Sequence, residues 1–322
     1  MPEVSVIMNC LNCAKYLREA IESVYAQTYK DWEIIFWDNA STDGSACIAK
    51  SYDSKLNYFR GQITVPLGKA RNLALNEAKG KYIAFLDCDD IYLPEKLEKQ
   101  MPLFKKNNRV GLVAANEIIF YEQKTAPERK YFSEKYPPPR GNIFSYALAN
   151  YSRTIPMDTV VIRSEILHTL DEWFMESFHV CTDFELFLRI LHDWEFDYVN
   201  EPLVRYRVHQ ESAMHQLSEY TPGEIIETLE GLSRRYPDFC LQYKRQIAQY
   251  YRLADYLWGK YYWMKDDRKK AREYFKKHLY HPKMLLTYMA SIISFNFISK
   301  AWYWSNKYFL KIFSAFGFRG KA

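Results

Sequence analysis

The sequence lacks an apolar stretch long enough for a standard membrane span. Its uncharged apolar run from Met284 to Ile298 has 15 residues, whereas a transmembrane helix needs about 20. The start, Met1 to Val6, also lacks the basic and apolar regions of a secretory signal peptide. These absences predict a protein that acts in the cytoplasm.

Cysteine is scarce and shows no regular spacing. Only Cys10 and Cys13 form a close pair, and no second pair completes the pattern of a zinc site. We therefore expect reduced thiols, as in cytosolic proteins. The six cysteines are at positions 10, 13, 47, 88, 181 and 240.

Acidic residues are absent from the last part of the chain. From His281 onward there are six basic residues and no acidic one, so the net charge of +5 leaves the first 280 residues at −1. A nearly neutral body argues against nucleic-acid binding. Aromatic residues alternate with lysines between Ala301 and Phe313, which suits a helix lying on an anionic membrane surface. Alternatively, this face docks on the preceding helices or on a second subunit, in a homo-oligomer.

A dense acidic cluster follows one predicted strand. Tyr82 to Leu86 is typical of a buried strand in a parallel sheet, and Asp87, Asp89 and Asp90 come directly after it. Ligands of such sheets bind at the carboxyl ends of the strands. A divalent cation that bridges substrate phosphates would explain three adjacent carboxylates. Alternatively, one aspartate caps the helix expected near Pro94.

Strand and helix patterns alternate through residues 1–115, which predicts a Rossmann-like α/β fold, a mostly parallel sheet with helices on both faces. From about Thr221 the pattern is helical. Tyr251 to Pro282 has the spacing of one helical hairpin with a turn at Asp266-Asp267, similar to a single tetratricopeptide unit.

Four motifs in order resemble family 2 inverting glycosyltransferases, which have the A-type (GT-A) fold. They are Val4–Met8 with Asn12, Glu33–Ser45, Gly68–Leu73 and Tyr82–Asp90, the last with an Asp-x-Asp motif. The resemblance weakens after residue 116. It implies a transferase domain at 1–220, divided into nucleotide-sugar binding (1–115) and acceptor and catalytic parts (116–220). The helical region would then cover 221–282 and the basic tail 283–322.

The resemblance also implies roles for individual residues. The donor would be bound by residues near the first strands, with Asp38 contacting the base and Arg71 the nucleotide or its phosphates. Asp87 and Asp89 would hold Mn²⁺ or Mg²⁺, and His209, at the end of Leu203–His209, would ligate the metal or touch the pyrophosphate. The donor-binding set is Asn9, Asn12, Asp38, Arg71 and Asp87.

Asp183 is the expected catalytic base. Inversion requires a carboxylate that takes the acceptor's proton on the side of the donor opposite the leaving diphosphate. Thr182 and Glu185 fit a capping box, which leaves Asp183 without a structural duty. The family has Glu-Asp here before a helix carrying an arginine, and this chain has Thr182-Asp183 with Arg189.

These observations predict a metal-dependent inverting glycosyltransferase. It would transfer a sugar, most simply from a UDP-sugar, to a hydroxyl of a glycan or lipid-linked acceptor, at the inner face of the cell membrane and in cell-surface polysaccharide synthesis. A non-catalytic scaffold with a relict sugar-nucleotide domain is one alternative. A sugar-phosphate nucleotidyltransferase is another, but it needs a glycine-rich loop where Asn9 to Cys13 has no glycine.

Overall fold

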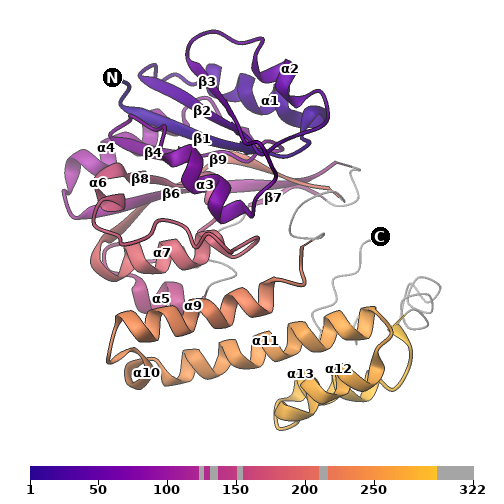
Figure 1. The fold of residues 1–322 in the computed structure, drawn as a ribbon. Helices are drawn as coiled ribbons and strands as arrows, with labels where there is room; N and C mark the ends of the chain where they lie inside the picture. The colour runs from indigo at the N-terminus through magenta and orange to yellow at the C-terminus, as the bar shows by residue number, and fades with distance from the viewer. Residues whose placement is uncertain (123–126, 131–136, 151–154, 210–216, 296–322) are drawn as a thin grey trace. The chain divides into compact units, whose positions relative to one another are not determined.

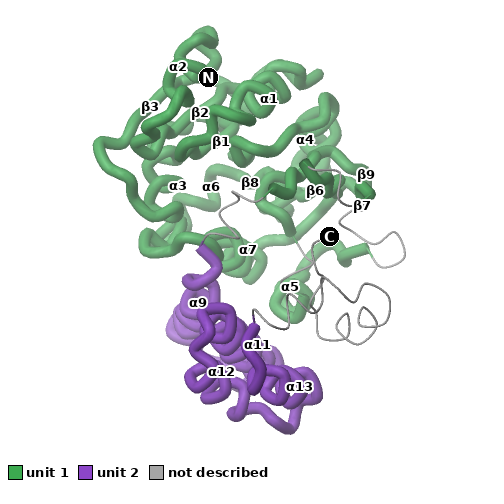
Figure 2. Tube along the Cα trace, turned by 90° about the vertical axis from the view of Figure 1, so that its right-hand side faces the viewer, with its two compact units in different colours: residues 1–212 green, residues 213–322 purple. Residues whose placement is uncertain are grey.

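The computed structural model describes residues 1–122, 127–130, 137–150, 155–209 and 217–295. The chain divides into two compact units, Met1–Ser212 and Ala213–Ala322 (Figure 2). The aromatic segment from Ala301 to Phe313, predicted to form a helix on a membrane surface, lies outside the described residues. Within the described part of the chain, no helix has the length and apolar character needed to cross a membrane.

The first unit is built on one sheet, which has nine strands among the described residues (Figure 1). Along the sheet the strand order is β3-β2-β1-β4-β8-β6-β9-β5, and β7 pairs with β6. The strands are β1 (Val4–Cys10), β2 (Trp32–Asp38), β3 (Leu56–Arg60), β4 (Tyr82–Phe85), β5 (Ile91–Tyr92), β6 (Val110–Tyr121), β7 (Arg129–Lys130), β8 (Val161–Arg163) and β9 (Glu195–Val208).

The first four strands are parallel, as the sequence predicts. β1 pairs with β2 and β4, and β2 pairs with β3. Almost every residue of β1 and β2 is buried, because helices cover both faces of the sheet. The predicted arrangement of alternating strands and helices is therefore confirmed for this half of the unit.

The helices cover the sheet through apolar faces. Alternate residues of β1, such as Val6 and Met8, pack in one core cluster with Leu17 and Ile21 of α1 and with Leu97 of α4. α3 contacts β1 and β2. The helices of this unit are α1 (Ala14–Tyr25), α2 (Ser45–Ala49), α3 (Leu67–Leu75), α4 (Lys96–Lys106), α5 (Phe144–Ala149), η2 (Met157–Thr159), α6 (Ser164–Leu167) and α7 (Thr182–Asp193).

The second half of the sheet contains a strand that the sequence did not indicate. β8 has only three residues and runs antiparallel to both β4 and β6. Two antiparallel pairings in succession make β6 parallel to β4, and β9 is parallel to β6. The carboxyl ends of β1, β2, β4, β6 and β9 therefore point to one edge of the sheet, where β8 begins.

The second unit is helical in its described residues, as predicted. Asp267 begins α12 by accepting a hydrogen bond from the Lys270 amide at 3.0 Å, so the turn lies where Asp266-Asp267 indicated. Trp263 and Phe275 are fully buried between the helices of this unit. Its helices are α9 (Thr221–Arg235), α10 (Phe239–Gln242), α11 (Lys244–Met264), α12 (Arg268–Phe275), η3 (Lys276–His278) and α13 (Pro282–Ala290).

The close packing of α11 on α12 gives a stability prediction. A Cβ at Gly259 would lie 2.3 Å from Cε1 of the fully buried Phe275 ring. Gly259→Ala should lower the free energy of unfolding by about 1–3 kcal/mol, because the ring has no free space to move into. Denaturant unfolding followed by circular dichroism measures this loss.

Gly231→Ala in α9 is the matched control. A Cβ there meets only the end of the Arg234 side chain, at 3.9 Å, so this variant should gain roughly 0.4–1 kcal/mol through a less flexible unfolded chain. Equal stabilities of the two variants would contradict the packing of α11 against α12.

Candidate functional site

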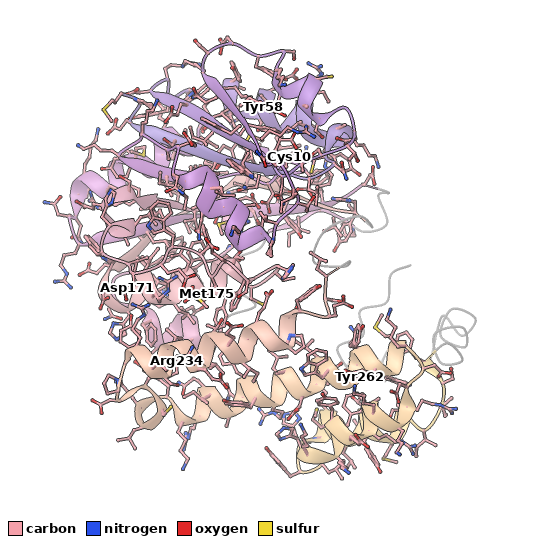
Figure 3. The ribbon with its side chains drawn as sticks, in the orientation of Figure 1. Cys10, Tyr58, Asp171, Met175, Arg234 and Tyr262 are labelled. Carbon is pink, nitrogen blue, oxygen red and sulfur yellow. The ribbon has the colours of Figure 1, made fainter. Side chains whose placement is uncertain are left out.

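The candidate site lies at the carboxyl edge of the sheet, where side chains from distant parts of the sequence meet. Cys10, labelled in Figure 3, is the last residue of β1 and pairs in register with Asp38 of β2. Asp87 to Asp90 follow β4, and His209 follows β9. Parallel strands bring these positions together, which explains why residues more than 120 positions apart in the sequence share one site.

Asp89 and His209 form a direct pair. Their Oδ2 and Nε2 atoms are 2.7 Å apart, and the exposed fractions of the two side chains are 26% and 6%. The His209 ring also packs on Tyr16, with ring centroids 4.9 Å apart. Adjacent ligands of an octahedral ion at about 2.1 Å are about 3 Å apart. Carboxylate oxygens suit Mn²⁺, and the 2.7 Å between the two atoms is close to the spacing of adjacent ligands on the predicted metal.

Asp87 belongs to a second acidic group with Asp90 and Asp158. Each contributes a carboxylate oxygen, and these oxygens lie within 4.8 Å of one another. Asp158 was not predicted. It lies on η2, and its Oδ1 accepts a hydrogen bond from the Asp87 amide at 2.6 Å. Local patterns do not indicate it, because a short turn before a three-residue antiparallel strand shows no clear periodicity.

The two buried members of this group differ from Asp87 in accessibility. Asp90 and Asp158 are 1% and 3% exposed, whereas the Asp87 side chain is 44% exposed. Burial raises the pKa of Asp90 well above its ordinary value. Burial, then the charge of Asp87, raises the pKa of Asp158 to about 7. Burial therefore favours the protonated form of Asp90 and Asp158, which lie beneath the turn, whereas the Asp87 side chain reaches solvent.

The idea that Asp90 or a neighbour caps the next helix is wrong. α4 begins at Lys96, and no side chain caps it. Asp90 instead accepts a hydrogen bond from the Arg207 amide at 2.7 Å, and the Arg207 Nε donates to the Asp89 carbonyl at 2.8 Å. Arg207 is a positioning residue that sequence reasoning missed. It joins β9 to the acidic turn and so places His209 beside Asp89.

Arg71 links the acidic turn to α7. Its guanidinium is 6% exposed, lies 3.4 Å from the Asp87 carboxylate and donates to the Thr182 hydroxyl. Its guanidinium also lies over the Phe174 ring, 5.5 Å from the centroid. Arg71 is therefore a buried arginine between two elements and not a solvated one on the helix surface.

The predicted capping box at the start of α7 is wrong. Cys181 is the N-cap residue, and no side chain caps the helix. Thr182 accepts from Arg71, and Glu185 pairs with Arg189 at 2.6 Å. The contact of Thr182 with Arg71 spans 111 positions, so local spacing did not reveal it. Glu185 and Arg189 are one helical turn apart, and their pairing takes Glu185 away from the helix start. Among the described residues, the only hydrogen-bond partner of the Asp183 side chain is the Phe184 amide, which donates to its Oδ1 at 2.8 Å.

Asp183 has the environment of a proton acceptor. Burial raises the pKa of its carboxyl above the ordinary value, Arg71 lowers it, and Asp87 raises it again. Apolar side chains, including Phe184 and Phe187, line a small cavity beside it. A raised pKa brings a carboxylate closer to the pKa that an efficient general base needs near neutral pH.

Asp38 is fully buried and already has three hydrogen-bond donors. The Ser41 amide, the Tyr58 hydroxyl and the Arg60 guanidinium donate to it at 2.7, 2.6 and 2.7 Å. The Arg60 side chain is 43% exposed. The predicted contact of Asp38 with a base therefore needs one of these donors to give way. Tyr58 is labelled in Figure 3 on the same half of the sheet as Cys10.

The two predicted asparagines lie at the end of β1 and in the loop after it. Nδ2 of Asn9 is buried and has no partner among the described residues, so it can donate to a ligand. Asn12 is exposed with φ of 56°. Its Oδ1 accepts from the Thr42 amide at 2.8 Å, which ties the loop to the β2–α2 connection.

A buried acid on β6 gives a pH prediction. Glu117 is 2% exposed, and burial, together with the charge of Asp158, raises its pKa from 4.5 to about 8. The folded state therefore holds a proton that the unfolded state loses between these values. Without added metal, the free energy of unfolding should fall as pH rises through this window, with a slope of up to about 1.4 kcal/mol per pH unit from this group.

Glu117→Gln should flatten that slope. Urea unfolding between pH 5 and 8 measures it. Glu165→Gln, whose side chain is 64% exposed, is the matched control and should keep the wild-type slope. If Glu117→Gln kept the wild-type slope, as Glu165→Gln should, Glu117 would already be ionised in the folded protein at pH 5.

Comparison with solved structures defines the fold. S. aureus TarS (residues 1–349, with UDP-GlcNAc) has a TM-score of 0.58 at 19% identity, covering 81% of this chain and 80% of that solved fragment. The mannosyltransferase PcManGT of Pyrobaculum calidifontis, with GDP-Man and Mn²⁺, has a TM-score of 0.54 at 16% identity, covering 72% and 64%. The predicted GT-A fold is confirmed.

Sequence comparison defines the family. A family model described as Glycosyl transferase family 2 matches residues 5–162. An uncharacterized glycosyltransferase of Methanocaldococcus jannaschii is 34% identical over 64% of this chain and 71% of its own. Escherichia coli WfgD, a UDP-Glc:α-D-GlcNAc-diphosphoundecaprenol β-1,3-glucosyltransferase, is 30% identical over 65% of this chain and 78% of its own. With this family's motifs assembled at one edge of its sheet, the chain belongs to glycosyltransferase family 2.

Proposed function

We propose that this glycosyltransferase is metal-dependent and inverting, and that it uses a nucleoside diphosphate sugar. The observation that carries the proposal is the position of Arg71, which contacts Asp87 on the acidic turn and Thr182 beside Asp183. A cation-binding acidic turn and a proton-accepting carboxylate therefore lie on two sides of one arginine. Inverting transfer needs both groups at one donor.

The acidic turn would hold the donor's diphosphate. Asp89 and His209 would bind Mn²⁺ or Mg²⁺, with Asp87 contributing from the same turn. The ion, when bound, supplies Lewis-acid stabilisation of the negative charge that develops on the leaving diphosphate. Arg71 would add positive charge on the side of the diphosphate away from the ion. The nucleobase of the donor would replace Arg60 as a hydrogen-bond partner of Asp38. Asn9 and Asn12 would contact the nucleotide.

Asp183 would act on the acceptor. Its carboxylate takes the proton of the acceptor hydroxyl as the hydroxyl oxygen attacks the anomeric carbon. The bond between that carbon and the phosphate oxygen breaks, and the nucleoside diphosphate leaves from the opposite side. The configuration at the anomeric carbon is therefore inverted.

Relatives indicate the substrate class. WfgD takes UDP-Glc and a diphosphoundecaprenol acceptor by its name, and TarS has been solved with UDP-GlcNAc. PcManGT has been solved with GDP-Man. We favour a UDP-sugar and a lipid-linked or glycan acceptor for cell-surface polysaccharide, at the inner membrane face. The basic residues after His281 would favour such a surface.

A donor panel tests the proposal. UDP- and GDP-sugars are incubated with the full chain, with Mn²⁺, Mg²⁺ or chelator, and with a set of lipid-linked and glycan acceptors. We expect metal-dependent release of UDP from one donor, and a product whose anomeric configuration by NMR is opposite to that of the donor. Retained configuration, or full activity in chelator, would contradict the proposal.

A further inference from the structure

Three thiols meet beside the acidic turn. Cys10 ends β1, Cys13 precedes α1, and Cys88 lies between Asp87 and Asp89. Their sulfur atoms all lie within 4.8 Å of one another. The sequence showed only the close pair of Cys10 and Cys13, because the third thiol lies in the turn after β4, 75 or more positions away. Cys88 therefore adds a third thiol to the pair that the sequence indicated.

We propose that Cys10, Cys13 and Cys88 form a binding site for a thiophilic metal ion such as Zn²⁺. Zinc–sulfur bonds of about 2.3 Å in tetrahedral geometry place thiolate sulfurs about 3.8 Å apart. The observed separations are at most 4.8 Å, so small side-chain shifts complete the site. Three thiolates form, each thiol releasing one proton as the ion binds.

The burial of the three cysteines gives the site one open side. Cys10 and Cys88 are 1% and 2% exposed, whereas Cys13 is half-buried. An ion can therefore enter past Cys13 while the other two sulfurs stay shielded from water. The Ser41 hydroxyl, which accepts a hydrogen bond from the Asn12 amide, lies 3.8 Å from the Cys10 sulfur. Water can supply a fourth ligand.

Occupation of this site would act on the donor site. Cys88 donates to the Asn9 carbonyl at 3.3 Å, so it already connects the acidic turn to the end of β1. Drawing its sulfur toward Cys10 and Cys13 would move Asp87 and Asp89, its neighbours in sequence. Zinc should therefore inhibit transfer. This consequence rests on the proposed function, whereas ion binding itself does not.

Cadmium titration tests the binding site. The reduced, metal-free full chain is titrated with Cd²⁺, and the thiolate-to-cadmium charge-transfer absorbance is recorded. We expect saturation at one ion per chain for the wild type. Cys13→Ser and Cys88→Ser should weaken this binding at least tenfold. The Asp89 and His209 pair contains no sulfur, so an ion bound there gives no such absorbance.

The exposed cysteines supply matched controls. Cys47→Ser and Cys240→Ser, both exposed, should titrate as the wild type does. Cys13 is half-buried, so its serine variant should keep the wild-type circular dichroism and melting temperature. Wild-type absorbance in Cys13→Ser, or its loss in Cys47→Ser, would overturn the proposed site.

A second arm separates the site from the proposed function. Zinc should reduce the stabilisation of the chain by UDP and Mn²⁺ in the wild type and reduce it less in Cys13→Ser. If no sugar nucleotide is turned over but the cadmium absorbance behaves as expected, the proposed function fails and the thiol site stands.

Discussion

Replacing Asp183 with asparagine should lower the transfer rate by roughly 10²–10⁴-fold, the range that a positioned general base contributes. Asparagine keeps an oxygen that can accept from the Phe184 amide, so α7 should begin as in the wild type. It has no lone pair basic enough to take the acceptor's proton. The rate is measured with saturating donor and acceptor, and UDP binding in the presence of Mn²⁺ should be unchanged.

Asp193→Asn is the matched control for this experiment. Asp193 is at the other end of α7, with a side chain 62% exposed, and its replacement should leave the rate within about twofold. Full activity of the Asp183→Asn variant would remove Asp183 from the mechanism. Loss of UDP binding in that variant would instead make it a donor ligand.

Asp89→Asn should lower the transfer rate by roughly 10²-fold or more, comparable to removing a group that stabilises charge in the transition state. His209→Ala should act in the same direction, because its imidazole lies 2.7 Å from the same carboxylate. In both variants the stabilisation of the protein by UDP should lose its dependence on Mn²⁺. Activity assays and thermal shift with and without chelator measure the two effects.

The control for the histidine is His192→Ala, at the carboxyl end of α7 with 36% of its side chain exposed. It should behave as the wild type in both assays. If the Asp89 and His209 variants kept Mn²⁺-dependent binding of UDP, the ion would belong to another set of carboxylates.

Local patterns were sufficient to predict the parallel half of the sheet. β1, β2 and β4 are nearly continuous apolar runs, each followed by polar side chains. Such runs are typical of strands that helices cover on both faces of a parallel sheet. The positions of Asp87 and Asp89 followed from the same reasoning, because parallel strands deliver their carboxyl ends to one edge. His209 was predicted from the resemblance to family 2, and the structure places it 2.7 Å from Asp89.

The missed residues depend on contacts that are distant in sequence. Asp158 reaches Asp87 only because β8 inserts antiparallel between β4 and β6. Thr182 does not cap its helix because Arg71, 111 positions away, donates to its hydroxyl. Arg207 lies within the motif Leu203–His209, but its contact with the Asp89 carbonyl depends on the pairing of distant strands. Sequence spacing predicts partners within a helix or strand and carries little information on partners between them.

Crystals grown with UDP and Mn²⁺ test the central claim most directly, since the ion's anomalous scattering identifies its ligands. The account predicts one manganese peak within about 2.3 Å of an Asp89 carboxylate oxygen and of Nε2 of His209, with the diphosphate of UDP on its open side. A peak held by Asp90 and Asp158 without Asp89, or bound UDP with no manganese, would contradict it.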